Sequence, residues 1–100
     1  MQAYEFCTKA AVLVNGDRAD AHGNLLENFY LISSFWQNYL TSSIGVDIEL
    51  KPSDVANMMI LLKVARSISG QYNADDYIDM AGYAGIAGYL SESNVDEVNE

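Results

Sequence analysis

The sequence is poor in four kinds of residue: it holds one cysteine, one histidine, one proline and five basic residues in a chain of 100. One cysteine cannot form an internal disulfide, and one Cys with one His cannot make a structural zinc site. Few Lys and Arg residues argue against direct binding to nucleic acid, because phosphate contacts need clustered cations. The N-terminus lacks signal-peptide features, and no apolar run reaches the roughly 20 residues of a membrane span. We therefore expect a cytoplasmic protein that contacts neither nucleic acid nor membrane.

Apolar and acidic residues are plentiful by contrast. Half of the residues are hydrophobic, and 14 acidic residues give a net charge of −9. A chain of this length and apolar content can bury one small core, so we expect a single domain. The charge predicts that any electrostatic partner is basic. Cys7 lies in an apolar segment with no base nearby, so we expect a small buried side chain and not a nucleophile.

The spacing of apolar residues predicts an all-α fold, a single-domain bundle of about four helices. The predicted helices cover residues 3–14, 24–42, 52–69 and 74–91, with Asn24 and Asn73 as caps, Pro52 as a helix start, and Gly16, Gly45 and Gly70 as stops. Residues 46–50 alternate apolar and acidic side chains, as a short extended connector does. Residues 92–100 are predicted to be an acidic flexible tail, which leaves residues 1–91 as the bundle domain.

Three of these helices carry patterns that predict how they pack. The second has a wide apolar face that is expected to supply the aromatic core: Leu25, Leu31, Ile32, Phe35, Trp36, Tyr39 and Leu40. The third is apolar nearly all round, which predicts the central position in the bundle. The fourth holds Gly82, Gly85 and Gly88, each of which costs a helix about 1 kcal/mol relative to Ala. Close approach of another helix would offset that cost, either inside the bundle or across a homodimer.

Lys63 and Arg66 lie three residues apart on the otherwise apolar third helix, so they share a face. Charges on such a helix need partners, and the candidates are Glu27 in the second helix and three carboxylates that begin the fourth, Asp75, Asp76 and Asp79. Two interpretations are open. The charges form an ion-pair network between helices, or the acids hold a divalent cation while Lys63 and Arg66 neutralise the phosphates of a nucleotide.

Five motifs stand out along the chain: Asp17–Phe29, Trp36, Pro52–Met59, Leu62–Arg66 and Asp79–Ala84. Over about residues 15–90 they resemble a family of small phage and prophage proteins of unknown function. Such proteins look distantly similar to the all-α MazG-like nucleoside triphosphate pyrophosphohydrolases, which hold Mg²⁺ through a Glu-x-x-Glu pair and a later Glu-x-x-Asp pair. The resemblance implies Mg²⁺ ligands at Glu27, Asp76 and Asp79. Tyr30 stands where the second acid of the first pair would be.

These observations lead to two main hypotheses about function, beside a purely structural or assembly role through the glycine-rich face of the fourth helix. The first is a non-enzymatic phage-type accessory protein or inhibitor, without cofactor or catalytic residue, that binds a basic host protein or ribonucleoprotein complex in the bacterial cytoplasm and blocks it, as anti-CRISPR proteins do. Its acids would mimic phosphates, and the expected contact residues are Asp17, Asp20, Tyr72, Asp75, Asp76 and Asp79. The alternative is a Mg²⁺-dependent nucleotide-binding or pyrophosphohydrolase-like protein. Its nucleotide-binding residues would be Glu27, Lys63, Arg66 and Tyr83, and its Mg²⁺ ligands would be Glu27, Asp76 and Asp79.

Overall fold

A computed structural model describes residues 1–16 and 25–99 of the chain, with the side chains of residues 1–16 and 25–92. In these residues the chain forms four helices and no strand: α1 (Ala3–Asn15), α3 (Leu25–Ile44), α4 (Pro52–Ser69) and α5 (Ala74–Asn99). The predicted all-α class is confirmed. The predicted cap Asn24 and the candidate contact residues Asp17 and Asp20 lie outside the described residues.

The starts of α4 and α5 follow the capping signals of the sequence. Pro52 is the first residue of α4, where its missing N–H is no loss. The backbone N–H of Lys51 donates to Asp54 Oδ2 at 2.8 Å, which satisfies a donor just before the helix. At α5 the backbone N–H of Asp75 donates to Asn73 Oδ1 at 3.0 Å, so Asn73 is the predicted cap.

The segment between α3 and α4 turns at a glycine and returns along α3. Gly45 has φ +82°, a left-handed conformation that favours glycine, and its N–H donates to the Thr41 carbonyl oxygen at 2.9 Å. The backbone N–H of Ile48 then donates to Thr41 Oγ1 at 3.0 Å, and that of Leu50 donates to Gln37 Oε1 at 2.8 Å. Two side chains of α3 thus hold the expected extended connector.

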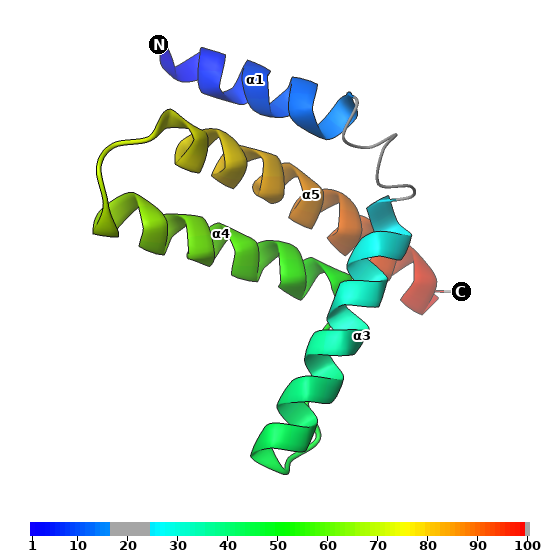
Figure 1. Ribbon diagram of the computed structural model, residues 1–100. Helices are drawn as coiled ribbons and strands as arrows, with labels where there is room; N and C mark the ends of the chain where they lie inside the picture. Colours follow the sequence, from blue (N-terminus) through cyan, green and yellow to red (C-terminus); the bar gives the residue numbers. More distant parts are fainter. Residues whose placement is uncertain (17–24, 100) are drawn as a thin grey trace.

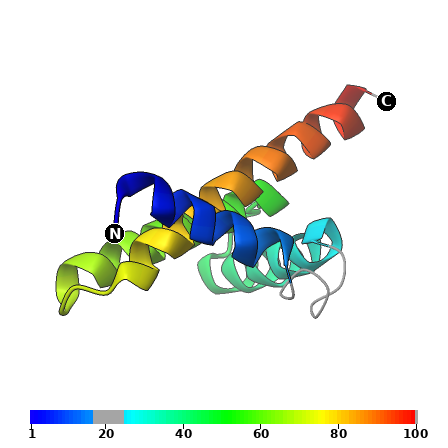
Figure 2. The same ribbon diagram turned by 90° about the horizontal axis from the view of Figure 1, so that it is seen from above.

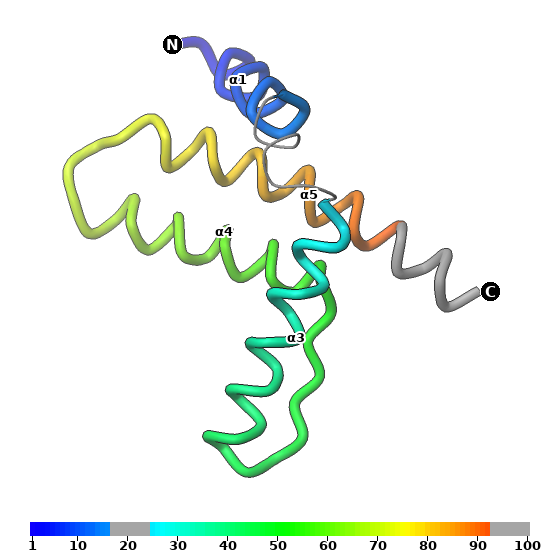
Figure 3. Tube along the Cα trace, turned by 45° about the vertical axis from the view of Figure 1, so that its right-hand side comes forward, coloured from blue at the N-terminus to red at the C-terminus, as the bar shows by residue number. Residues whose placement is uncertain are grey.

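The helices are arranged around an antiparallel α4–α5 pair (Figure 1). Helix α1 crosses the side of α5 that faces away from α4, as the view from above also shows (Figure 2). Helix α3 begins beside the second half of α5 and leaves the pair at a steep angle, so that α3 and α4 form an L (Figures 1 and 3). The core contacts of α3 therefore come from its first half and from Trp36 just beyond it.

The core lies where α3, α4 and α5 meet. Its buried side chains are Phe29, Val55, Ala56, Ile86, Ala87 and Leu90, and half-buried neighbours from α1, α3, α4 and α5 surround them. Trp36 is among these neighbours. Three other residues of the predicted aromatic face, Leu31, Phe35 and Tyr39, are exposed, so the prediction that they belong to the core is wrong. Only one side of α3 contacts the core, and the apolar face predicted from the sequence is wider than that side.

Two further expectations differ from the structure in extent. Helix α5 continues to Asn99, past the predicted end at about Ser91. Helix α4 packs on α5 and α3, but its side opposite α5 is exposed, so α4 is not covered all round by the described helices. Within the described residues no helix has both the length and the apolar character needed to cross a membrane.

Candidate functional site

The charged residues singled out in the sequence meet between α4 and α5. Lys63 Nζ lies 2.9 Å from Asp79 Oδ2, and Arg66 Nε lies 4.0 Å from Asp76 Oδ1. The helices are antiparallel, so a step of three residues forward along α4 matches a step of three residues back along α5. The i, i+3 spacing on each helix therefore places both cations opposite carboxylates. The interpretation as an ion-pair network between helices is the one that the geometry shows.

The two ion pairs differ in burial. The side chains of Lys63 and Asp79 are 14% and 20% exposed, so this short pair is shielded on both sides. In the second pair Asp76 is 7% exposed and Arg66 is 62% exposed. Asp76 lies in the first turn of α5, where the helix dipole favours a negative charge. This position compensates for the long contact to Arg66.

The acidic contact surface expected at the start of α5 is reduced, because two of its carboxylates are at least half-buried. Asp76 is buried and Asp79 is half-buried, and each faces a cation of α4. Of the three carboxylates that begin α5, Asp75 is the one that is exposed. An incoming basic partner would meet Asp75 directly, and it would have to displace Lys63 or Arg66 to reach the other two. The predicted surface is therefore smaller than the sequence pattern indicates.

Aromatic side chains gather where the turn between α4 and α5 leads into α5. The rings of Tyr72 and Tyr77 are stacked, with centroids 6.0 Å apart, and Phe6 of α1 meets Tyr77 edge to face at 6.5 Å. Tyr72 is 72% exposed, and Tyr77 is exposed as well. The stack holds two tyrosine rings at the surface in a fixed orientation. Two of the predicted contact residues, Tyr72 and Asp75, are thus exposed where the turn leads into α5.

The alternative metal and nucleotide residues are not brought together in the same way. Glu27 belongs to the first turn of α3, which lies beside the second half of α5, whereas Asp76 and Asp79 lie in its first turns (Figure 1). Tyr83 packs against the hydrophobic core. Within the described residues no three Asp, Glu, His or Cys side chains lie close enough to share a metal ion. The described residues do not fit a Mg²⁺ site, and we derive no reaction step from one.

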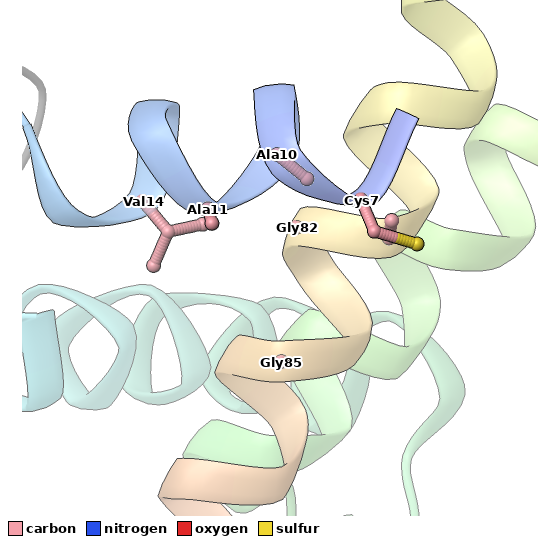
Figure 4. Close-up of a pocket in the computed structure, with 7 residues that line it drawn as sticks. Cys7, Ala10, Ala11, Val14, Gly82 and Gly85 are labelled. Carbon is pink, nitrogen blue, oxygen red and sulfur yellow. The ribbon is translucent and has the colours of Figure 1, made fainter. Parts of the chain in front are cut away.

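A shallow apolar groove of about 290 Å³ runs between α1 and α5, and the sequence did not predict it (Figure 4). Small side chains line it, among them Ala10, Ala11 and Ala81, together with Gly82 and Gly85. A Cβ atom at Gly82 would lie 3.4 Å from Val14 Cγ2, so one of the three helix-five glycines does permit close approach inside the bundle.

Cys7 stands at the edge of this groove and is exposed, so its expected burial is wrong. The alanines and glycines beside it are too short to cover its side chain. The signal for the groove is the run of small residues in both helices, which predicts close helix contact but not how completely the contact is filled.

The structure defines the chain as a small all-α protein whose charged residues join its two central helices. That class includes many unrelated activities, because a fold does not determine function. The chain belongs to the family described as Domain of unknown function (DUF6378), whose model matches residues 5–91.

Two relatives come from mycobacteriophages. The Gene 55 protein of Mycobacterium phage L5 is 42% identical over 79 residues, which are 79% of this chain and 47% of that protein. The Gene 55 protein of Mycobacterium phage D29 is 38% identical over 88 residues, which are 88% of this chain and 54% of that protein. The chain thus spans about half the length of these relatives. No solved structure matches the chain significantly.

These relationships confirm the expected family of phage proteins of unknown function. The name Gene 55 protein states no activity for either relative. The more distant likeness to MazG-like pyrophosphohydrolases is not among the relationships found, and it stays a hypothesis.

Proposed function

We propose that the chain is a non-enzymatic accessory protein of phage type that binds a basic host protein or ribonucleoprotein complex in the bacterial cytoplasm and blocks it. Inhibition of a defence complex, as by anti-CRISPR proteins, is the form of this activity that we put forward. The observation that carries the proposal is the exposed, stacked pair Tyr72 and Tyr77, with the exposed Asp75 between them in the sequence.

This patch combines two properties of protein-binding surfaces. Tyrosine contributes a large, rigid contact area and a hydroxyl group, and it is enriched among the residues that dominate binding energy. The net charge of −9 steers a basic partner toward the chain and repels nucleic acid. Charge alone gives speed of association more than specificity, so the tyrosines have to supply the specific contact.

A matched pair of variants tests the patch. Tyr72 and Tyr4 are 72% and 71% exposed, but Tyr4 lies on α1. The chain carrying Tyr72→Ala should capture at least about tenfold less of a basic protein complex from host lysate at physiological salt, since truncating a hot spot costs about 2 kcal/mol or more. The chain carrying Tyr4→Ala should capture as much as the unmodified chain. Recovery of nucleotides alone, or equal losses in both variants, would contradict the proposal.

Nucleotide binding is the second candidate, and one observation favours it: Lys63, Arg66, Asp76 and Asp79 do lie together, and the Arg66 side chain is 62% exposed. In this hypothesis Arg66 contacts a phosphate that approaches the end of the α4–α5 pair. Incubation with nucleoside triphosphates and Mg²⁺ tests it. Pyrophosphate release that Arg66→Met and Asp79→Asn abolish would support an enzyme, and no release would end this alternative.

A further inference from the structure

Two apolar stripes lie on the arms of the L formed by α3 and α4. On α3 the stripe follows a four-residue step along Leu31, Phe35 and Tyr39, and on α4 it follows Met58, Leu61 and Ile68; we call these six residues the outer face. All six are exposed. None of them belongs to the buried core or to the side chains that pack against it.

Helical spacing fixes the direction of both stripes. On α4 the chain turns by about 100° per residue, so Leu61 lies almost opposite Lys63, the residue that contacts α5. On α3, Leu31 and Phe35 lie about 160° and 120° round the helix from Phe29 on the core side. Phe35 and Tyr39 each lie about 160° from Gln37, which holds the connector. Both stripes therefore point away from every partner that the described residues supply.

Charge is sparse on the same surface although the chain is strongly acidic. Residues 28–46 contain no Asp, Glu, Lys, Arg or His, and neither do residues 55–62. Asp54, one turn before Met58 on the same side of α4, is the nearest carboxylate along that stripe, so a basic partner would find little counter-charge on the outer face. A second copy of the chain could approach it without like-charge repulsion at the contact, despite the net charge of −9.

The accessible surface is larger than that of a monomer of this mass. The chain exposes 7034 Å², whereas a folded monomer of 11.0 kDa exposes about 5,600 Å² by the usual scaling, so the excess is about 1,400 Å². The radius of gyration is 15.0 Å against about 12.7 Å for a compact domain of 100 residues. A standard interface buries about 800 Å² on each partner. The excess, summed over the whole chain, is larger than the area that one partner contributes to such an interface.

The second half of α3 also needs support. It extends away from α4 and α5 (Figures 1 and 3), and beyond Trp36, which packs against the core, Gln37 and Thr41 accept hydrogen bonds from the connector. An isolated helix of a few turns is marginal in water, because helix stability in proteins comes mainly from packing of an apolar face.

We propose that a second copy of this chain covers the outer face in a symmetric dimer. The face is apolar and uncharged, as the centres of homodimer interfaces are. A twofold axis places the same stripes of both chains against each other, which is the commonest arrangement of homo-oligomers. The proposed interface is formed by α3 and α4. The glycines of α5, which the sequence analysis considered for a homodimer contact, are not part of it.

The mass in solution tests the dimer without any variant. Light scattering coupled to size exclusion should give about 22 kDa at micromolar concentrations for the 11.0 kDa chain. The urea midpoint should rise with protein concentration, since dissociation accompanies unfolding. A mass of 11 kDa over the whole range of concentration, with a constant midpoint, would overturn the proposal.

A matched pair of variants locates the interface. Leu61 on α4 and Val12 on α1 are both 66% exposed aliphatic residues. Leu61→Glu should weaken the dimer at least about a hundredfold, because it places a charge in a dry contact, and Val12→Glu should leave the mass unchanged. Loss of helicity in Leu61→Glu with a folded dimeric Val12→Glu also supports the proposal, because folding and dimerisation are then coupled. A dimer that persists in Leu61→Glu, or that Val12→Glu dissociates, refutes this interface.

Discussion

The pair of Lys63 and Asp79 gives the sharpest prediction about stability. Their charged atoms lie 2.9 Å apart, and their side chains are 14% and 20% exposed. Asp79→Ala leaves an ammonium group without its carboxylate in a site that water reaches poorly. Breaking a fully buried pair costs about 3–5 kcal/mol, and the remaining exposure lowers this to about 2–3 kcal/mol.

The double variant Lys63→Met with Asp79→Leu should recover most of this loss. It removes both charges and keeps similar volume, and apolar replacements of a buried pair are often neutral or stabilising. We expect its free energy of unfolding to lie within about 1 kcal/mol of the unmodified chain. The control is Arg66→Met, which breaks the longer pair. Because Arg66 is 62% exposed, this loss should stay below about 1 kcal/mol.

Urea unfolding followed by circular dichroism measures all four chains, at one fixed protein concentration so that any change in association does not enter. A small loss in Asp79→Ala, similar to that in Arg66→Met, would refute the assignment of the shielded pair as a structural link. A double variant as unstable as Asp79→Ala would show that the ion pair stabilises the fold beyond neutralising its own two buried charges.

Three other predictions about local features are tested by the same unfolding assay, with four substitutions. Gly85→Ala should raise the free energy of unfolding by about 1 kcal/mol, because a Cβ atom there meets nothing within 4 Å; a loss would indicate an unseen contact. Gly45→Ala should lower it by about 1 kcal/mol, because φ is +82°, whereas Gly70→Ala, which has open space and a negative φ, should not lower it; equal effects would contradict this reasoning. Gln37→Leu removes the acceptor of the Leu50 N–H and should cost about 1 kcal/mol, and no change would mean that water replaces that bond.

Local sequence signals predicted the helices well, because short-range chemistry decides them. Asn73 caps α5 by accepting the Asp75 N–H, and Gly45 ends α3 through a positive φ. The predicted end of α5 at about Ser91 was less accurate, since helix α5 continues to Asn99. No glycine or proline follows Ser91 to stop the helix, and the acidic composition alone does not do so.

The charged site could be predicted in part. Spacing placed Lys63 and Arg66 on one face of α4, and their pairing with Asp79 and Asp76 was one of the two open interpretations. The sequence could not show that Asp75 alone of its cluster is exposed, because that depends on how α5 is rotated against α4. The stack of Tyr72 and Tyr77 likewise depends on the path of the turn between these helices.

Helix α4 shows why its apolar pattern was interpreted incompletely. A helix that is apolar nearly all round needs cover on every side, and the sequence therefore predicted a central position. In the structure α5 and α3 cover Val55 and Ala56, whereas Leu61 and Ile68 remain exposed. The apolar pattern of α4 indicates that other residues pack on every side of the helix, but it does not indicate whether they come from the same chain or from another one. If a second copy lies on Leu61, as we propose, α4 is central after all, in the dimer and not in the single chain.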